Sequence, residues 1–337
     1  MKLSLIIQLC MILSCLAILC DPAIADAPSI FSYFAIEWGS PNTYYYARHN
    51  LTSGEDLLTQ QFQSWNEINP LHPSVANTDV VQYFSSTNDV SNFPVVCSYN
   101  IKSNSVTQDL IGTGFNYGYG YEPLSQLRLV GTDNVMYGMG QDQNTNLAML
   151  KYDFKEQTLQ FYPLPTKMIS YLFQCYMDAP SNIFYVLFVK GQTFNIWLMN
   201  GIDGTTISSH VITVAEPLQT YDESGVVYLS VYQNKAYVGL GNLDYVAASQ
   251  QYLFEVDLTA NTAKVIFVQP NFFVQSSDTG GFLLDPINGY MLAVLTNQPN
   301  VKDSAYFWMI NLQTKGAVQY PNPYPMPGET HCIYYLE

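Results

Sequence analysis

Residues 307–316 read FWMINLQTKG, an apolar and aromatic run that ends at Asn311 and passes into a short polar turn. The same pattern occurs six times along the chain, each time with an Asn or Asp at the end of the run. The other copies are YYYARHNLTSG (44–54), VVCSYNIKSN (95–104), AMLKYDFKEQT (148–158), IWLMNGIDG (196–204) and YLFEVDLTANT (252–262). The anchors Asn50, Asn100, Asp153, Asn200, Asp257 and Asn311 are spaced 47 to 57 residues apart, on average about 52. Six units of that length account for the 312 residues that follow residue 25.

Each anchor has a physical role in a hairpin. Asn and Asp side chains accept hydrogen bonds from backbone N–H groups two residues on, which stabilises the turn between two strands. The period-two alternation around the anchors buries one face of each strand. Further strand-like runs lie upstream of every hairpin, including residues 127–130, 172–177 and 282–284. Four antiparallel strands in each of six repeats predict an all-β fold, a six-bladed β-propeller; an array of two-sheet sandwiches and a seven-blade count are the alternatives.

The two ends of the repeat region do not match. Residues 31–36 look like a second strand of a blade, whereas HCIYYL (331–336) looks like an extra first strand. We therefore expect the C-terminal strand to fill the innermost position of the first blade and close the ring, which also removes exposed strand edges.

The composition is acidic, aromatic and poor in charge. The 337 residues carry a formal net charge of -15, yet only 12% are charged and 15% are aromatic. Disordered segments show the opposite balance, so the composition indicates a folded chain. An acidic surface repels phosphate groups, which excludes a nucleic acid as partner. We expect the aromatic side chains to pack between neighbouring blades.

Residues 1–25 predict a signal peptide. Lys2 supplies a positive charge, residues 3–19 are apolar, and Ala23-Ile24-Ala25 fits the small-x-small pattern of a cleavage site. A retained membrane anchor is the alternative, but this run of about 17 residues is at the lower edge of membrane-spanning length. We expect the propeller domain to comprise residues 26–337, with no membrane span after signal removal, secreted or in the lumen of the secretory or endolysosomal pathway.

Three cysteines follow the predicted cleavage site: Cys97, Cys175 and Cys332. None has the spacing of a zinc ligand set. An oxidising compartment allows one disulfide among them, whose partners the spacing does not identify, and three buried thiols are the alternative. Asn50 begins the only N-glycosylation sequon, Asn50-Leu51-Thr52, and is the predicted glycosylation site.

The repeat turn also carries a resemblance. The Asn/Asp-Leu-x-Thr pattern, clearest at residues 257–259 and 311–314, is similar to the turn that recurs in propellers of the quinoprotein-like and related superfamilies. The resemblance covers nearly all of residues 30–337 and implies an architecture without implying a chemistry. No specific family is matched, since no Trp-Asp dipeptide closes a blade and only one Gly-Gly pair, Gly280-Gly281, resembles the kelch repeat.

Two sets of residues are candidates for ligand binding. Tyr117, Tyr119 and Tyr121 alternate with Gly in a connection between the second and third repeats. Exposed Tyr beside Gly suits recognition of sugars or peptides by stacking and hydrogen bonding, although the same segment would suit an inner strand that packs against a neighbouring blade. His331 begins the predicted innermost strand, at the rim of the channel, and joins the candidate ligand site.

Asp178 and Asp285 are candidate metal ligands, because both lie near strand ends that would face the channel mouth. Calcium is bound by carboxylates and carbonyls, and six-bladed lactonase-type enzymes hold calcium in this position. No Asp-x-Asp-x-Asp loop is present, and carboxylates at turn ends usually cap the turn. We therefore predict no cofactor, with calcium as the alternative.

These observations favour a monomeric, secreted and singly glycosylated binding or interaction module for a protein or glycan ligand. The alternative is an extracellular hydrolase, similar to the lactonases, with a carboxylate or calcium site at the mouth of the propeller channel. The sequence leaves open whether the protein is an enzyme and favours the interpretation that it is not.

Overall fold

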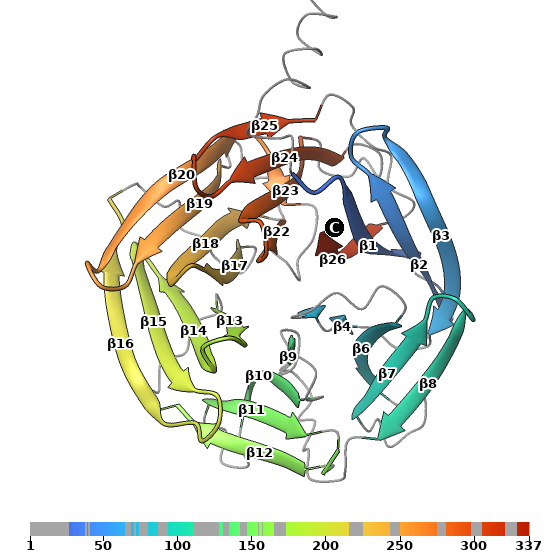
Figure 1. The fold of residues 1–337 in the computed structure, drawn as a ribbon, viewed down its shortest axis with the longest axis horizontal. Helices are drawn as coiled ribbons and strands as arrows, with labels where there is room; N and C mark the ends of the chain where they lie inside the picture. The colour runs from blue at the N-terminus through green and yellow to red at the C-terminus, as the bar shows by residue number, and fades with distance from the viewer. Residues whose placement is uncertain are drawn as a thin grey trace, which may run out of the picture.

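The computed structural model describes residues 27–37, 39, 41–64, 69–70, 72–73, 80–86, 94–110, 128–130, 135–141, 147–153, 155–156, 158–164, 173–215, 225–242, 250–274, 281–297, 305–320 and 329–336. Every regular element in these ranges is a β-strand, and the strands form six sheets arranged around a common axis (Figure 1). The predicted six-bladed β-propeller is thereby confirmed.

Each blade runs from an inner strand beside the axis to an outer strand at the rim (Figure 1). Blade 1 comprises β26 (Glu329–Leu336), β1 (Ile30–Glu37), β2 (Asn42–Asn50) and β3 (Glu55–Ser64). Blade 2 comprises β4 (Asn69–Pro70), β6 (Val80–Ser86), β7 (Pro94–Asn100) and β8 (Ser105–Leu110). Blade 3 comprises β9 (Arg128–Val130), β10 (Val135–Gln141), β11 (Leu147–Asp153) and β12 (Thr158–Pro163).

The second half of the chain repeats this order. Blade 4 comprises β13 (Phe173–Asp178), β14 (Ile183–Lys190), β15 (Thr193–Asn200) and β16 (Thr206–Thr213). Blade 5 comprises β17 (Gly225–Tyr232), β18 (Lys235–Asn242), β19 (Gln250–Asp257) and β20 (Thr262–Pro270). Blade 6 comprises β21 (Phe273–Val274), β22 (Phe282–Asp285), β23 (Tyr290–Thr296), β24 (Ala305–Asn311) and β25 (Ala317–Gln319).

The two ends of the chain share blade 1. The C-terminal strand β26 pairs antiparallel with β1, so that Leu336 lies opposite Phe31 and Glu329 lies opposite Ile36. The strand predicted from residues 331–336 therefore takes the innermost position of the first blade.

Two inner strands depart from the simple four-strand repeat. The segment with Pro70 and Pro73 forms two short pieces: β4 pairs with β6, whereas β5 (His72–Pro73) runs parallel to β9 of the next blade. Proline donates no backbone hydrogen bond, which limits each piece to two residues. In blade 6, two separate strands pair with β23: β21, which ends at Val274, and β22, which begins at Phe282.

The six anchor side chains make the hydrogen bonds that the sequence predicts. Each side-chain oxygen accepts from backbone N–H groups two or three residues on, over 2.8 to 3.0 Å. The recurring Asn or Asp thus closes the hairpin between the third and fourth strand of every blade.

The core is divided among the interfaces between blades. Five clusters of buried apolar residues each join two neighbouring blades. Between blades 4 and 5, for example, the ring of Phe194 meets that of Phe254 edge to face at 5.3 Å. Aromatic side chains therefore pack between neighbouring blades, as predicted.

Cys97 and Cys175 are buried thiols on β7 and β13, and they do not form a disulfide with each other. Within the described ranges, no helix is long and apolar enough to cross a membrane. The predicted signal peptide, residues 1–25, lies outside those ranges.

Candidate functional site

The strand order divides the connections between two faces of the propeller. Because neighbouring strands in a blade are antiparallel, the turns after the first and third strands open on one face. We call this the turn face; it carries the six anchored turns. The links after the second strand and those between blades open on the opposite side, the connection face.

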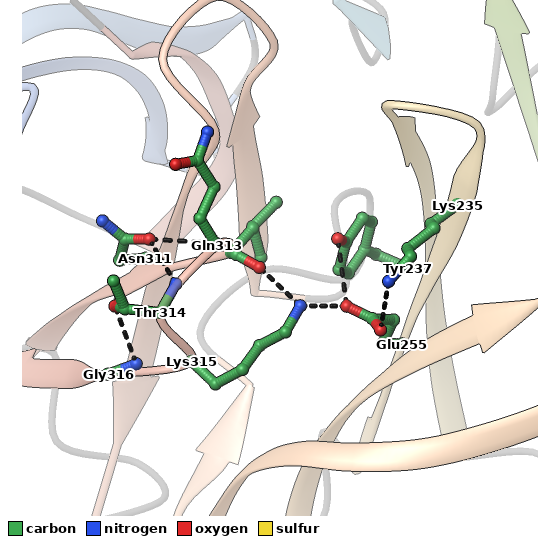
Figure 2. A network of polar contacts seen from close by, with 9 residues as sticks. Lys235, Tyr237, Glu255, Asn311, Gln313, Thr314, Lys315 and Gly316 are labelled. Carbon is green, nitrogen blue, oxygen red and sulfur yellow. Dashed lines mark hydrogen bonds and ion pairs between the residues drawn. The ribbon is translucent and has the colours of Figure 1, made fainter.

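The turn face is occupied by contacts that hold blades together. Figure 2 shows Lys315, in the turn between β24 and β25 of blade 6. Its ammonium group contacts Glu255 on β19 of blade 5 and the backbone oxygen of Leu312. Lys235 of blade 5 donates to the same carboxylate over 2.7 Å, and Tyr237 donates to it over 3.3 Å. This network joins blades 5 and 6 through one carboxylate that is only 15% exposed.

The network changes the titration of its members. Burial alone would raise the pKa of Glu255, but hydrogen bonds and charges from Lys235 and Lys315 lower it below the ordinary value. Burial, together with the charge of Glu255, raises the pKa of Tyr237. Glu255 is therefore held as a carboxylate, which is what an ion pair between blades requires.

Comparable contacts join other neighbouring blades. Ile202 lies in the turn between β15 and β16 of blade 4. Its backbone oxygen accepts hydrogen bonds from Lys151 over 3.2 Å and from Tyr162 over 3.3 Å, both in blade 3. His210 of blade 4 lies 2.8 Å from the side-chain oxygen of Asn261 in blade 5. The turn face thus carries polar contacts between blades 3 and 4, 4 and 5, and 5 and 6.

Asp178 and Asp285 lie on the turn face, at the ends of inner strands β13 and β22. Asp285 accepts from the backbone N–H groups of Ile287 and Asn288 over 2.9 and 3.2 Å, and from the Asn288 side chain over 2.8 Å. Asp178 accepts from the hydroxyl of Ser181 in its own turn. Both carboxylates therefore cap turns, in blades that blade 5 separates.

The described residues contain no group of three or more His, Cys, Asp or Glu side chains that could hold a metal ion.

Asp178 also affects a neighbouring tyrosine. Burial and the nearby charge of Asp178 raise the pKa of Tyr185 to about 12. The Asp178 carboxylate therefore raises the pKa of a phenol and also accepts a hydrogen bond within its own turn.

The tyrosine candidates Tyr117, Tyr119 and Tyr121 lie outside the described residues. The strands on either side of them are described: β8 ends at Leu110 and β9 begins at Arg128. Both of these strand ends open on the connection face. The tyrosine candidates and the two aspartates therefore belong to connections that leave the propeller on opposite faces.

His331 lies near the beginning of β26, at the end of the strand that opens on the connection face. The pairing of β26 with β1 shifts register there, because Cys332 lies opposite Phe34 and Thr330 opposite Ala35. His331 is the extra residue of this β-bulge, a feature common beside binding sites.

The other histidines with described side chains serve the packing of the blades. Nδ1 of the buried His49 lies 3.1 Å from Asp56, and its ring stacks on Phe307 of blade 6. Asn50, the predicted glycosylation site, ends β2 on the turn face, and its side-chain oxygen accepts from Thr52 and Ser53.

Two buried polar residues on inner strands, Gln174 and Ser230, are not predicted from the sequence. Gln174 on β13 donates to the backbone oxygen of Val227 on β17 over 3.4 Å, which joins the inner strands of blades 4 and 5. Ser230 on β17 is also completely buried. In the sequence, Gln174 is a single polar residue in the apolar run FQCYM. Period-two alternation assigns it to a strand but does not indicate that its side chain is buried.

Comparison with known proteins gives a likeness of fold. No family model matches the chain, and no curated protein matches its sequence. TolB from Acinetobacter baumannii superposes with a TM-score of 0.55 and 10% identity, over 90% of this chain and 65% of TolB. A putative TolB from Agrobacterium tumefaciens gives 0.51 and 9%, over 88% of this chain and 92% of that one.

A putative 6-phosphogluconolactonase from Bacteroides fragilis gives a TM-score of 0.50 and 12% identity, over 94% of this chain and 100% of that one. At such identities a shared fold implies no shared chemistry. The chain spans about two thirds of the Acinetobacter TolB, at 65%. Together, the six sheets and these likenesses show that the chain is a six-bladed β-propeller.

Proposed function

We propose that this protein is a secreted binding module that holds a protein or glycan ligand on its connection face. The observation that supports the proposal is the set of hydrogen bonds on the turn face. On the turn face, the carboxylates of Glu255 and Asp285 and one side-chain oxygen of each of the six anchors accept hydrogen bonds within turns or between blades. The connection face is where the chain leaves and re-enters successive blades, and such connections carry the function of many rigid scaffolds.

The tyrosine segment is the proposed contact surface. Tyr117, Tyr119 and Tyr121 are spaced two residues apart, with Gly118 and Gly120 between them. Tyr combines a large apolar ring with a hydroxyl that donates and accepts, which suits both sugar rings and peptide backbone. We further propose that His331 adds a polar group beside this surface, because its strand end opens on the same face.

The net charge restricts the ligand. A chain with a formal charge of -15 repels anionic ligands at long range and attracts cationic ones. We therefore propose a neutral glycan, or a neutral or basic protein surface, as the ligand class. The long-range contribution is screened beyond about 8 Å at physiological ionic strength, so specificity must come from contacts such as those of the tyrosines.

The proposal is tested by screening the labelled protein on glycan and peptide arrays and repeating each hit with two variants. Replacing Tyr117, Tyr119 and Tyr121 by Ala should weaken binding at least about tenfold, or 1.4 kcal/mol. The matched control replaces Ile202 and Ile287, two exposed apolar residues of the turn face, by Ala and should leave binding unchanged. A hit that survives the tyrosine replacements, or that is lost in the control, would contradict the proposed surface.

The alternative to the binding module is an enzyme that uses calcium at Asp178 and Asp285. A calcium titration followed by thermal unfolding distinguishes the two, provided that each variant is compared with itself with and without calcium. Asp285→Ala removes turn hydrogen bonds and lowers stability in either case. A calcium-dependent rise in Tm that disappears in Asp178→Ala and Asp285→Ala would favour the enzyme; no rise would favour the binding module.

A further inference from the structure

The outer edges of the blades differ in how they are protected. An outer strand presents unpaired backbone N–H and C=O groups, and proteins block such edges with charged residues, proline or very short strands. Five of the six outer strands follow this rule: β3 carries Glu55 and Asp56, β8 carries Asp109, β12 ends at Pro163, β20 carries Lys264 and Pro270, and β25 is three residues long.

The sixth outer strand, β16 of blade 4, has no proline and no charged residue, and it is not short. Like β3 and β20, it carries a register shift against its neighbouring strand, here at Ile207, between Thr206 opposite Met199 and Ser208 opposite Leu198. Its eight residues read TISSHVIT, without proline, Lys, Arg, Asp or Glu. Ile207 and Val211 point outward and are 53% and 67% exposed. A long, uncharged edge strand rich in β-branched residues is the kind that pairs with another strand. Among the described residues, no further strand pairs with its outer side.

We propose that β16 pairs antiparallel with β16 of a second copy of this chain, so that two copies of blade 4 form one continuous sheet. The sequence of β16 is self-complementary about Ser209. With Ser209 on the two-fold axis, pairing residue by residue places Ile207 opposite Val211 of the second copy and Val211 opposite its Ile207, so that the register shift at Ile207 falls at the two ends of the paired segment. A two-fold interface requires such reciprocity, and it places an apolar cross-strand pair on each side of the axis.

The distribution of charge favours a second copy as the occupant. The whole chain has a formal charge of -15, which opposes self-association. Residues 173–215, which comprise blade 4 and its turns, contain only three charged residues: Asp178, Lys190 and Asp203. Two copies that meet at blade 4 therefore contact each other through a blade with few charges. The acidic residues of the other blades stay farther apart, so their mutual repulsion is more strongly screened.

The dimer should be weak and dependent on concentration. It joins one strand edge and a few side chains on each copy, which is at the small end of specific interfaces. The interaction uses the rim of blade 4 and is independent of ligand binding on the connection face.

Sedimentation velocity over a range of protein concentrations tests the proposal, with two lysine variants. Ser209→Lys places identical charges opposite each other at the axis and should weaken association at least about tenfold. Thr213→Lys is the matched control: it adds the same charge on the same strand, but its two copies lie about 27 Å apart, eight residues along the paired strands. Thr213→Lys should change association by less than about twofold, the size expected for a remote, screened charge.

Several results would overturn the proposal. A wild-type protein that stays monomeric at all accessible concentrations would do so, as would a dimer that Ser209→Lys does not weaken. Equal weakening by both variants would contradict the register centred on Ser209.

A covalent test checks the same register. Cysteines at position 209 would face each other within the distance that a disulfide spans. Ser209→Cys should therefore become a covalent dimer with oxidised glutathione, whereas Thr213→Cys and the wild type should not. Failure of Ser209→Cys to link, or equal linking of Thr213→Cys, would refute the arrangement.

Discussion

The edge-to-face contact between Phe194 of blade 4 and Phe254 of blade 5 makes a quantitative prediction about the coupling of blades. Both rings are fully buried, and their centroids are 5.3 Å apart with an interplanar angle of 80°. Such a pair contributes about 0.5–1.5 kcal/mol beyond the area it buries. Phe194→Leu and Phe254→Leu should each destabilise the protein by about 1–2 kcal/mol, because Leu retains much of the apolar volume.

The informative quantity is the coupling in the double variant. Combining the two substitutions removes the ring contact only once, so the loss should fall short of the sum of the single losses by about 0.5–1.5 kcal/mol. Urea unfolding is followed by tryptophan fluorescence and by circular dichroism, whose coincidence checks for a single transition. The control cycle combines Phe254→Leu with Phe31→Leu, a buried ring in the cluster between blades 6 and 1.

The control cycle should be additive within about 0.3–0.5 kcal/mol, because the two sites share no partners. Additivity of Phe194 and Phe254 themselves would show that these residues, 60 positions apart in sequence, do not touch. Packing between blades 4 and 5 as described would then be refuted.

Further predictions concern the turns, the charges, the thiols and the N-terminus. Asp257→Ala removes two exposed hydrogen bonds of 2.9 Å and should cost about 1–2 kcal/mol in urea unfolding, whereas Asp257→Asn should cost less than half of that. Because the folded pKa of Glu255 is lowered, its contribution is present above its unfolded pKa, near 4.5, and is lost as the pH falls through the folded value. Since the partner lysines are 45% and 32% exposed, Glu255→Gln should cost at most about 1 kcal/mol at pH 7 and progressively less in acid, as measured by unfolding at several pH values. Cys97 and Cys175 should react with a thiol reagent only after denaturation; rapid reaction of the native protein would contradict their burial. N-terminal sequencing of protein secreted by eukaryotic cells should begin at Asp26, and retention of residues 1–25 would contradict cleavage.

The number of blades could be predicted because its signal is local. The hydrogen bonds of an Asn or Asp anchor span only two or three residues, so the residue that makes the turn also marks it in the sequence. Alternation along each strand is equally local. The position of β26 was predictable for a related reason, since a strand left over at one end and missing at the other fits a single position in a ring.

Non-local features could not be predicted in this way. The parallel pairing of β5 with β9 joins residues more than 50 positions apart, and β5, with only His72 and Pro73, is too short to show any alternation. The pairing of both β21 and β22 with β23 is likewise not marked by a periodic pattern, because it depends on which strand each of the two segments meets.

The candidate site illustrates the same limit. Sequence position placed Asp178 and Asp285 correctly at strand ends but could not show that their oxygens bond to their own turns. Nor could it show that these carboxylates lie on the opposite face from the end of β8 and the beginning of β9. That separation follows only when the direction of every strand in the ring is known.

The proposed function depends most directly on which face the ligand covers. Backbone hydrogen exchange, measured with and without a ligand obtained from the arrays, reports this in one experiment. We expect protection at the end of β8 and at the beginnings of β9 and β26, where these strands open on the connection face. Protection confined to the anchored turns, such as residues 258–261 and 312–316, would show that the ligand binds the turn face and would contradict the proposal.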